Sequence, residues 1–173
     1  DSVASRGLGD VYKRQGQDHV VGKGKYIDRL IRSGFMPSLL FYGPPGIGKT
    51  TLAEMMAHVS NRAFVPLSAV TSNVKELRKV LEEAEDRLGA QGRETILFLD
   101  EIHRFNKSQQ DVLLPYVEKG KIILMGATTE NPYFYVNGAL LSRLQVVQLH
   151  PLDDKAVKEL LMRALKDEKK GYG

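Results

Sequence analysis

The chain alternates short apolar runs with stretches in which apolar residues lie three and four positions apart. The apolar runs, each typical of a buried strand, occur at residues 39–42, 64–68, 95–99, 122–125 and 146–149. The helical spacing predicts amphipathic helices at residues 49–59, 74–88 and 108–118. Strands that alternate with helices in this way predict an α/β fold with a parallel five-stranded sheet flanked by helices.

The same periodicity divides the chain into segments. Residues 1–15 show neither the helical nor the strand period that the following residues show. They are predicted to be a disordered leader. Residues 16–150 contain the predicted sheet and form the core domain. After Pro151 the apolar spacing predicts one more helix, whose apolar face has no partner within the chain. We therefore expect residues 151–173 to be the start of a helical lid domain that is cut short.

Composition narrows the class of protein without assigning a function. The 173 residues carry a formal net charge of +4 and no cysteine, which excludes disulfides, thiolate zinc sites and cysteine nucleophiles. The four histidines lack the spacing of metal ligands. No apolar run approaches the roughly 18 residues of a membrane span, and the N-terminal residues lack the apolar region of a signal peptide. The default expectation is a cytoplasmic protein. Its small excess of basic over acidic residues is compatible with a nucleic-acid partner.

The strongest chemical signal is a glycine-rich loop between an expected strand and an expected helix. Residues 43–50 read Gly-Pro-Pro-Gly-Ile-Gly-Lys-Thr, which is a complete phosphate-binding loop. Its glycines allow backbone N–H groups to turn toward phosphate oxygens. Lys49 adds a charge for the β- and γ-phosphates, and the Thr50 hydroxyl is a ligand for Mg²⁺. The predicted nucleotide contacts of this segment are Gly43, Pro44, Pro45, Gly46, Ile47, Gly48, Lys49, Thr50 and Thr51.

An acidic pair follows the third predicted strand. Asp100 and Glu101 lie at its carboxyl end, where α/β sheets bind ligands. Asp100 is predicted to complete the Mg²⁺ site begun by Thr50, and Glu101 to polarise the attacking water as general base. A pair of exposed loop acids is the alternative, but the phosphate loop about fifty residues earlier favours the catalytic interpretation.

Two further elements allow two interpretations each. Residues 126–132 directly follow the fourth predicted strand, where a hydroxyl or amide either contacts the γ-phosphate or only turns the chain. Arg143 is either a surface charge or an arginine finger that enters the nucleotide site of a neighbouring subunit. Sequence spacing does not separate these possibilities.

Taken in order, these elements resemble the AAA+ ATPases of the clamp-loader group. The run of residues 100–111, together with residues 68–72 and 126–132, is similar to the replication-associated recombination protein A family, which includes the Werner helicase-interacting protein. The resemblance covers about residues 16–173. It implies that residues 43–50 are the Walker A loop and that Asp100 with Glu101 are Walker B.

The resemblance also implies roles that spacing alone does not. Thr129 matches sensor 1, and Arg143 matches the arginine finger acting in trans, although Leu144 stands where the family has a cysteine. The segment that lines the adenine corresponds to Gln17, Asp18 and His19.

The implied function is that of a DNA-dependent ATPase at stalled replication forks, with ATP and Mg²⁺ as cofactors. Forked DNA or single-strand/double-strand junctions, single-stranded DNA-binding protein and further copies in a homotetramer are the implied partners, with nucleoid association if the source is bacterial. The alternatives are a clamp-loader subunit or branch-migration motor, a nucleotide-sensing module with negligible turnover, and a small-molecule kinase. The last ranks lowest because such kinases lack an Asp-Glu pair followed by a Thr-Thr turn.

Overall fold

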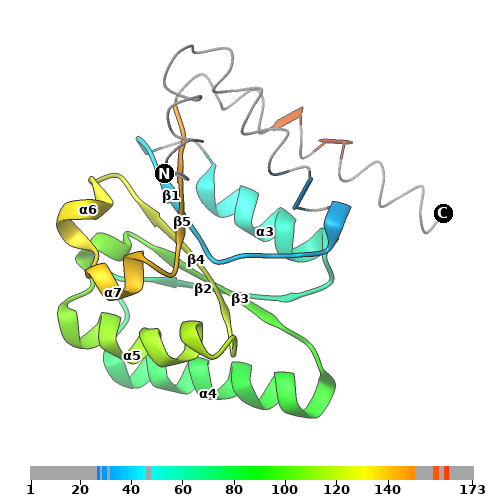
Figure 1. Cartoon of the computed structure of the whole chain (residues 1–173), viewed down its shortest axis with the longest axis horizontal. Coiled ribbons are helices and arrows are strands. Elements are labelled where there is room, and N and C mark those ends of the chain that lie inside the picture. Colours follow the sequence, from blue (N-terminus) through cyan, green and yellow to red (C-terminus); the bar gives the residue numbers. More distant parts are fainter. Residues whose placement is uncertain are drawn as a thin grey trace.

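The computed structural model describes residues 27, 29–30, 32–45 and 48–150, with residues 158, 159, 162 and 163 beyond them. Five strands form one sheet in the order β2-β3-β4-β1-β5, and every neighbouring pair is parallel (Figure 1). The strands are β1 (Leu39–Tyr42), β2 (Ala63–Ser68), β3 (Thr95–Asp100), β4 (Ile123–Thr128) and β5 (Gln145–Gln148). The predicted α/β class and parallel five-stranded sheet are therefore confirmed.

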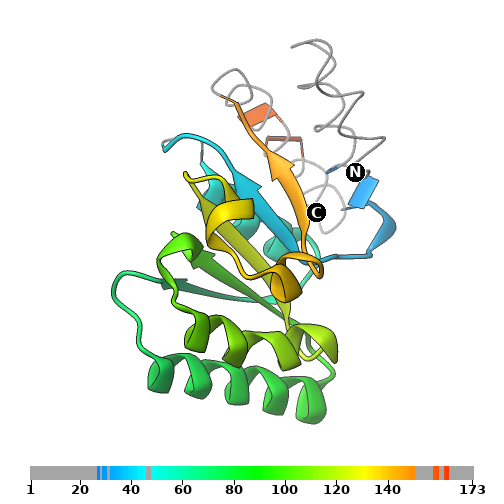
Figure 2. The same ribbon diagram turned by 60° about the vertical axis from the view of Figure 1, so that its left-hand side comes forward.

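Helices cover both faces of the sheet. Helix α3 (Lys49–Val59) lies on one face, and helices α4 (Val74–Gln91) and α5 (Lys107–Glu118) lie on the other (Figures 1 and 2). Three short elements complete the described part, namely η1 (Ile102–Arg104), α6 (Pro132–Tyr135) and α7 (Gly138–Leu141). The three long helices agree with the predicted ranges, whereas the short elements were not predicted.

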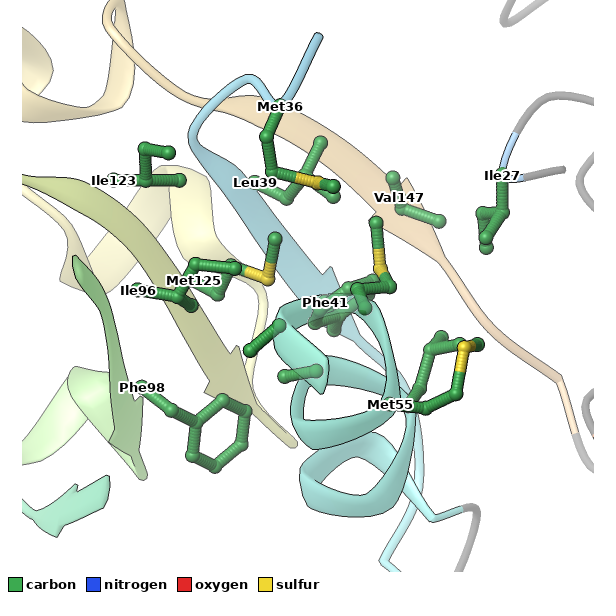
Figure 3. Packing of buried hydrophobic residues seen from close by; sticks show 14 of the residues in the cluster. Ile27, Met36, Leu39, Phe41, Met55, Ile96, Phe98, Ile123, Met125 and Val147 are labelled. Atoms are coloured by element: carbon green, nitrogen blue, oxygen red, sulfur yellow. The ribbon is translucent and has the colours of Figure 1, made fainter. Parts of the chain in front are cut away.

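Strand alternation explains why the central strands are apolar throughout. In β3, Ile96 and Phe98 belong to the buried cluster beneath α3 (Figure 3). Leu97 and Leu99 belong to the cluster that α4 and α5 cover. Successive side chains of a strand point to opposite faces, and both faces of this sheet are packed, so neither set meets water.

The end of β4 differs from the prediction. The sequence analysis ended this strand at Met125 and assigned the residues from Gly126 onward to a turn, but β4 continues to Thr128. These last residues pair with β1 from Leu40 to Tyr42, so pairing outweighs their turn propensity. A Cβ at Gly126 would lie 3.0 Å from Leu40 Cδ1 and 3.1 Å from Ile102 Cδ1. A small residue is therefore needed where η1 packs onto β4.

Several predictions fall on residues outside the described part. They are the leader at residues 1–15, the adenine segment at 17–19 and nearly all of the lid segment at 151–173, of which the four described residues are helical. In the described part of the chain, no helix is both long and apolar enough to span a membrane.

Candidate functional site

The candidate site lies at the carboxyl ends of β1, β3 and β4. Strand β4 runs between β1 and β3, and the chain leaves β1 directly into the glycine-rich loop. Hydrogen bonds hold the start of the loop in place: the Gly43 N–H donates to the Thr128 carbonyl of β4 at 3.1 Å, and the preceding residue, Tyr42 of β1, accepts the Leu149 N–H at 2.7 Å. The order of the parallel strands therefore brings the loop near the acidic pair.

Gly43 has a packing role that the sequence did not indicate. It was predicted to be one of the glycines that turn N–H groups toward phosphate, and its own N–H is bonded to the Thr128 carbonyl. A Cβ at Gly43 would lie 2.5 Å from the Leu149 carbonyl oxygen, closer than real Cβ atoms come. The approach of the chain after β5 to the end of β1 therefore requires glycine here, whatever the loop binds.

The N-terminus of α3 differs from those of the other described α-helices. Asparagine side chains accept backbone N–H groups at the starts of α4, α5, α6 and α7. Helix α3 has no side-chain cap and no acidic residue in its first turn, and it begins after Gly48 at φ 76°. The first N–H groups of an α-helix have no intrahelical partner, and they favour an anion. The loop therefore presents unoccupied donors together with the positive end of a helix dipole.

Lys49 is buried at this helix start. Only 9% of the residue is exposed, and its Nζ donates to the Pro44 carbonyl at 3.0 Å across the loop. Burial lowers the pKa of Lys49, and the Asp100 carboxylate partly opposes this shift. The influence of Asp100 on Lys49 agrees with the strand order, which puts both residues at the carboxyl edge of the sheet. A buried ammonium group at an uncapped helix start is suited to bind phosphate.

The acidic pair differs in backbone and side-chain environment. Asp100 continues the face of β3 that carries Phe98, so it lies on the α3 side of the sheet and is exposed. Its Oδ1 accepts the Glu101 N–H at 3.0 Å. Glu101 is half-buried and adopts φ 55° and ψ 46°, a left-handed conformation that is unusual for a residue other than glycine. Its carbonyl accepts the Arg104 N–H at 2.8 Å and so begins η1.

The two threonines at the end of β4 differ in environment. Thr128 is 1% exposed, and its Oγ1 lies 2.8 Å from Nδ1 of His103 on η1. Ala127 packs in the cluster beneath α3, so alternation directs Thr128 to the opposite face. Thr129 directly follows the end of the strand and is exposed. The predicted sensor residue therefore lies at the carboxyl edge of the sheet, and its neighbour Thr128, like His103, was given no role from the sequence.

Arg143 lies at the other end of the sheet. Its Nη2 donates to Oε2 of Glu118 at 2.9 Å, with half of the arginine side chain exposed. It lines a groove of about 560 Å³ together with Tyr133 and with Ser38 and Gln145, which are at the amino ends of β1 and β5. The glycine-rich loop follows the carboxyl end of β1, so Arg143 and Lys49 are separated by the length of that strand.

Metal binding in this region would rest on few protein ligands. Among the described residues, no group of three or more His, Asp or Glu side chains is arranged to hold a metal ion. Thr50 and Asp100, the predicted Mg²⁺ ligands, are both exposed at the loop. Such a sparse oxygen set fits Mg²⁺, which keeps several waters and takes its remaining ligands from phosphates.

Comparison with known proteins agrees with this geometry. The model of the AAA family, the ATPase family associated with various cellular activities, matches residues 39–152. The chain is 50% identical over 158 residues to replication-associated recombination protein A from Escherichia coli (strain K12), covering 91% of this chain and 35% of that protein. It is 49% identical over 150 residues to ATPase WRNIP1 from Dictyostelium discoideum, covering 87% of this chain and 17% of that protein.

A solved structure shows the same fold at lower identity. The RuvB Holliday junction branch migration motor of Thermotoga maritima superposes with a TM-score of 0.61 at 28% identity, over 77% of this chain and 45% of that one. The chain thus spans 35% of the recombination protein's length and less than half of the solved motor's.

Proposed function

Because the chain belongs to the ATPase family associated with various cellular activities, we propose that it binds ATP with Mg²⁺ at the carboxyl edge of its sheet and hydrolyses it. The observation that carries this proposal is the buried Lys49 at the uncapped start of α3, electrostatically coupled to Asp100. A cation, free helix N–H groups and a carboxylate around one space match the needs of a metal-bound triphosphate.

Several residues of the loop and of the first turn of α3 would hold the phosphates. Lys49 would exchange the Pro44 carbonyl for the β- and γ-phosphate oxygens, which are better partners for a buried charge. The N–H groups of Thr50 and Thr51 would point at the same anion from the first turn of α3. Thr50 and Asp100 would hold Mg²⁺, which would neutralise charge developing on the phosphates.

The remaining chemistry would depend on positioning. Glu101 would accept a proton from the attacking water, and Thr129, directly after the carboxyl end of β4, would contact the γ-phosphate. Gln17, Asp18 and His19 would line the adenine, and residues 151–173 would begin the lid.

Arg143 would complete the site of another copy of the chain. Its place at the amino end of β1 supports this role, because it is separated from its own phosphate loop by a strand of four residues, roughly 13 Å long. An exposed arginine whose described partner is the exposed Glu118 is available for a stronger partner. Hydrolysis would then require assembly, with a homotetramer as the proposed state.

We further propose that the complete protein acts on DNA at stalled replication forks. The 50% identity to a replication-associated recombination protein supports this assignment over a branch-migration motor, to which the chain is similar at 28%. Forked or gapped DNA and single-stranded DNA-binding protein are the proposed partners, and the proposed location is the cytoplasm, on the nucleoid if the protein is bacterial.

Two measurements test the proposal. Calorimetry with ATP and Mg²⁺ is expected to give saturable binding that Lys49→Ala abolishes, and no heat from the unaltered chain would refute nucleotide binding. ATP hydrolysis measured against protein concentration should rise faster than linearly, and Arg143→Ala should remove that rise without weakening ATP binding. A flat, negligible rate would favour the nucleotide-sensing module. The rate with and without forked DNA then tests the DNA dependence.

A further inference from the structure

His103 lies between the acidic pair and the end of β4. It is the second residue of η1, the short helix that begins directly after Glu101. Its Nδ1 is 2.8 Å from Thr128 Oγ1, and its ring meets that of Tyr135 edge-on with centroids 6.1 Å apart. The preceding residue, Ile102, is fully buried and packs where Gly126 leaves room on β4. Two consecutive residues of η1 are therefore fixed to the same strand.

The hydrogen bonds of Thr128 determine which atom of His103 carries the proton. A hydroxyl donates one hydrogen bond and accepts two. Thr128 Oγ1 donates to the Glu130 carbonyl at 3.2 Å and accepts the Glu130 N–H at 3.0 Å. The remaining position is an acceptor, so satisfying all three contacts requires His103 to donate from Nδ1–H. We assign this tautomer from the network.

The strained residue next to this anchor is Glu101. A left-handed conformation at a residue other than glycine persists only when surrounding contacts enforce it. On one side the Asp100 carboxylate accepts its N–H, and on the other its carbonyl accepts the Arg104 N–H. The second contact depends on the position of η1, which His103 ties to Thr128. Loss of that tie would leave η1 free to shift and Glu101 free to relax.

We propose that His103 is a positioning residue for the general base: its hydrogen bond to Thr128 fixes η1 and so keeps Glu101 in the conformation that directs its carboxylate. This inference rests on the proposed hydrolytic function. The carboxylate must lie within hydrogen-bond reach of the attacking water, and a displacement of about 1 Å is enough to lower the rate about a hundred-fold. Nucleotide binding should change little, because α3 lies on the opposite face of the sheet and the phosphate loop contacts the backbone carbonyl of Thr128, not its side chain.

The test compares three variants that alter the contact between His103 and Thr128. In His103→Ala the contact is lost, and kcat is expected to fall roughly 10- to 100-fold with the Kd for ATPγS changed less than about two-fold. In His103→Asn the amide nitrogen occupies nearly the place of Nδ1, so kcat should stay within about three-fold of the unaltered chain. Thr128→Val keeps the side-chain shape but also removes the two hydrogen bonds to Glu130, so it should be at least as slow as His103→Ala. The double variant should be no slower than Thr128→Val alone.

A spectroscopic measurement without nucleotide examines the contact itself. Side-chain ¹⁵N NMR of the ligand-free chain should find the His103 proton on Nδ1, and Thr128→Val should redistribute it between the two ring nitrogens. An unprotonated Nδ1 would overturn the assignment. The positioning role is wrong if His103→Ala turns over at the unaltered rate, or if a folded His103→Asn is as slow as the alanine variant.

Glu101→Gln, measured in parallel, separates this inference from the function on which it rests. A Glu101→Gln rate equal to that of the unaltered chain would remove the assignment of the base, and an inactive unaltered chain would remove the hydrolytic function. In both cases the NMR result still decides whether His103 holds η1 on β4.

Discussion

Replacing Gly43 by alanine should damage the fold, although the motif containing this residue is a ligand-binding one. The added Cβ would lie 2.5 Å from the Leu149 carbonyl oxygen and 3.2 Å from its carbon. Both are backbone atoms, so no side-chain rotation relieves the clash, and the carbonyl must withdraw by about 1 Å to reach ordinary contact distance. That movement pulls the end of β5 away from β1, where the Leu149 N–H donates to the Tyr42 carbonyl at 2.7 Å.

The cost follows from these two contacts. Overpacking of a tight site costs about 1–3 kcal/mol, and a weakened backbone hydrogen bond adds about 0.5–1.5 kcal/mol. The expected loss for Gly43→Ala is therefore about 2–4 kcal/mol, which for a chain of this size lowers Tm by roughly 5–15 °C. Strand β5 is at the sheet edge and pairs with β1 alone, so the damage should be local.

Gly48→Ala is the matched control. It makes the same chemical change in the same loop, but a Cβ at Gly48 meets nothing within 4 Å and only its φ of 76° opposes the substitution. The expected cost is about 1 kcal/mol, or a Tm lower by about 2–4 °C. Thermal denaturation, monitored by circular dichroism, gives the Tm of both variants. Hydrogen exchange at the Leu149 N–H reports whether the end of β5 opens locally. A Gly43→Ala chain that melts no lower than Gly48→Ala, with Leu149 still protected, would refute the packing explanation.

Three further predictions concern the charged residues of the site. Glu101→Gly should abolish hydrolysis but raise the Tm of the ligand-free chain by about 2–4 °C, since glycine removes about 1 kcal/mol of left-handed backbone strain. An unchanged Tm would mean that the strain is negligible. The lowered pKa of Lys49 means that, between that pKa and the ordinary value of 10.5, the unfolded chain binds more protons. Stability should therefore rise with pH through this window, measured as Tm without Mg²⁺ or nucleotide, and Lys49→Met should lack that rise. Glu118→Gln should leave Tm within about 2 °C because its pair with Arg143 is exposed; a larger drop would make the pair structural.

The strands and long helices were predictable because burial repeats with the period of each element. Residues 95–99 form an unbroken apolar run since both faces of β3 are packed, and this pattern needs no knowledge of the partners. The ends of elements depend instead on pairing. Nothing local to Gly126 indicates that β1 continues beside it for two more residues, and so the predicted end of β4 was three residues too early.

The same limit applies within the phosphate loop. The sequence predicts that Lys49 and Asp100 share one edge, because each follows a strand and ligand sites of parallel α/β sheets lie at the carboxyl ends of strands. It does not distinguish Gly43, required by the Leu149 backbone, from Gly48, required by its positive φ. Both glycines satisfy one pattern, yet the first is required by a contact with a residue more than a hundred positions away in the chain.

The end of β4 decides which way Thr128 points, and this follows from the two-residue period of a strand. If the strand ended at Met125, the direction of Thr128 would depend on an irregular turn and could not be assigned. Because β4 stays paired through Thr128, the alternation fixes Thr128 toward η1. The hydrogen bond to His103 is a consequence of that register and spans 25 residues of sequence. The residue that we infer to hold the base in place therefore has no local sequence signal, since its role depends on where a neighbouring strand ends.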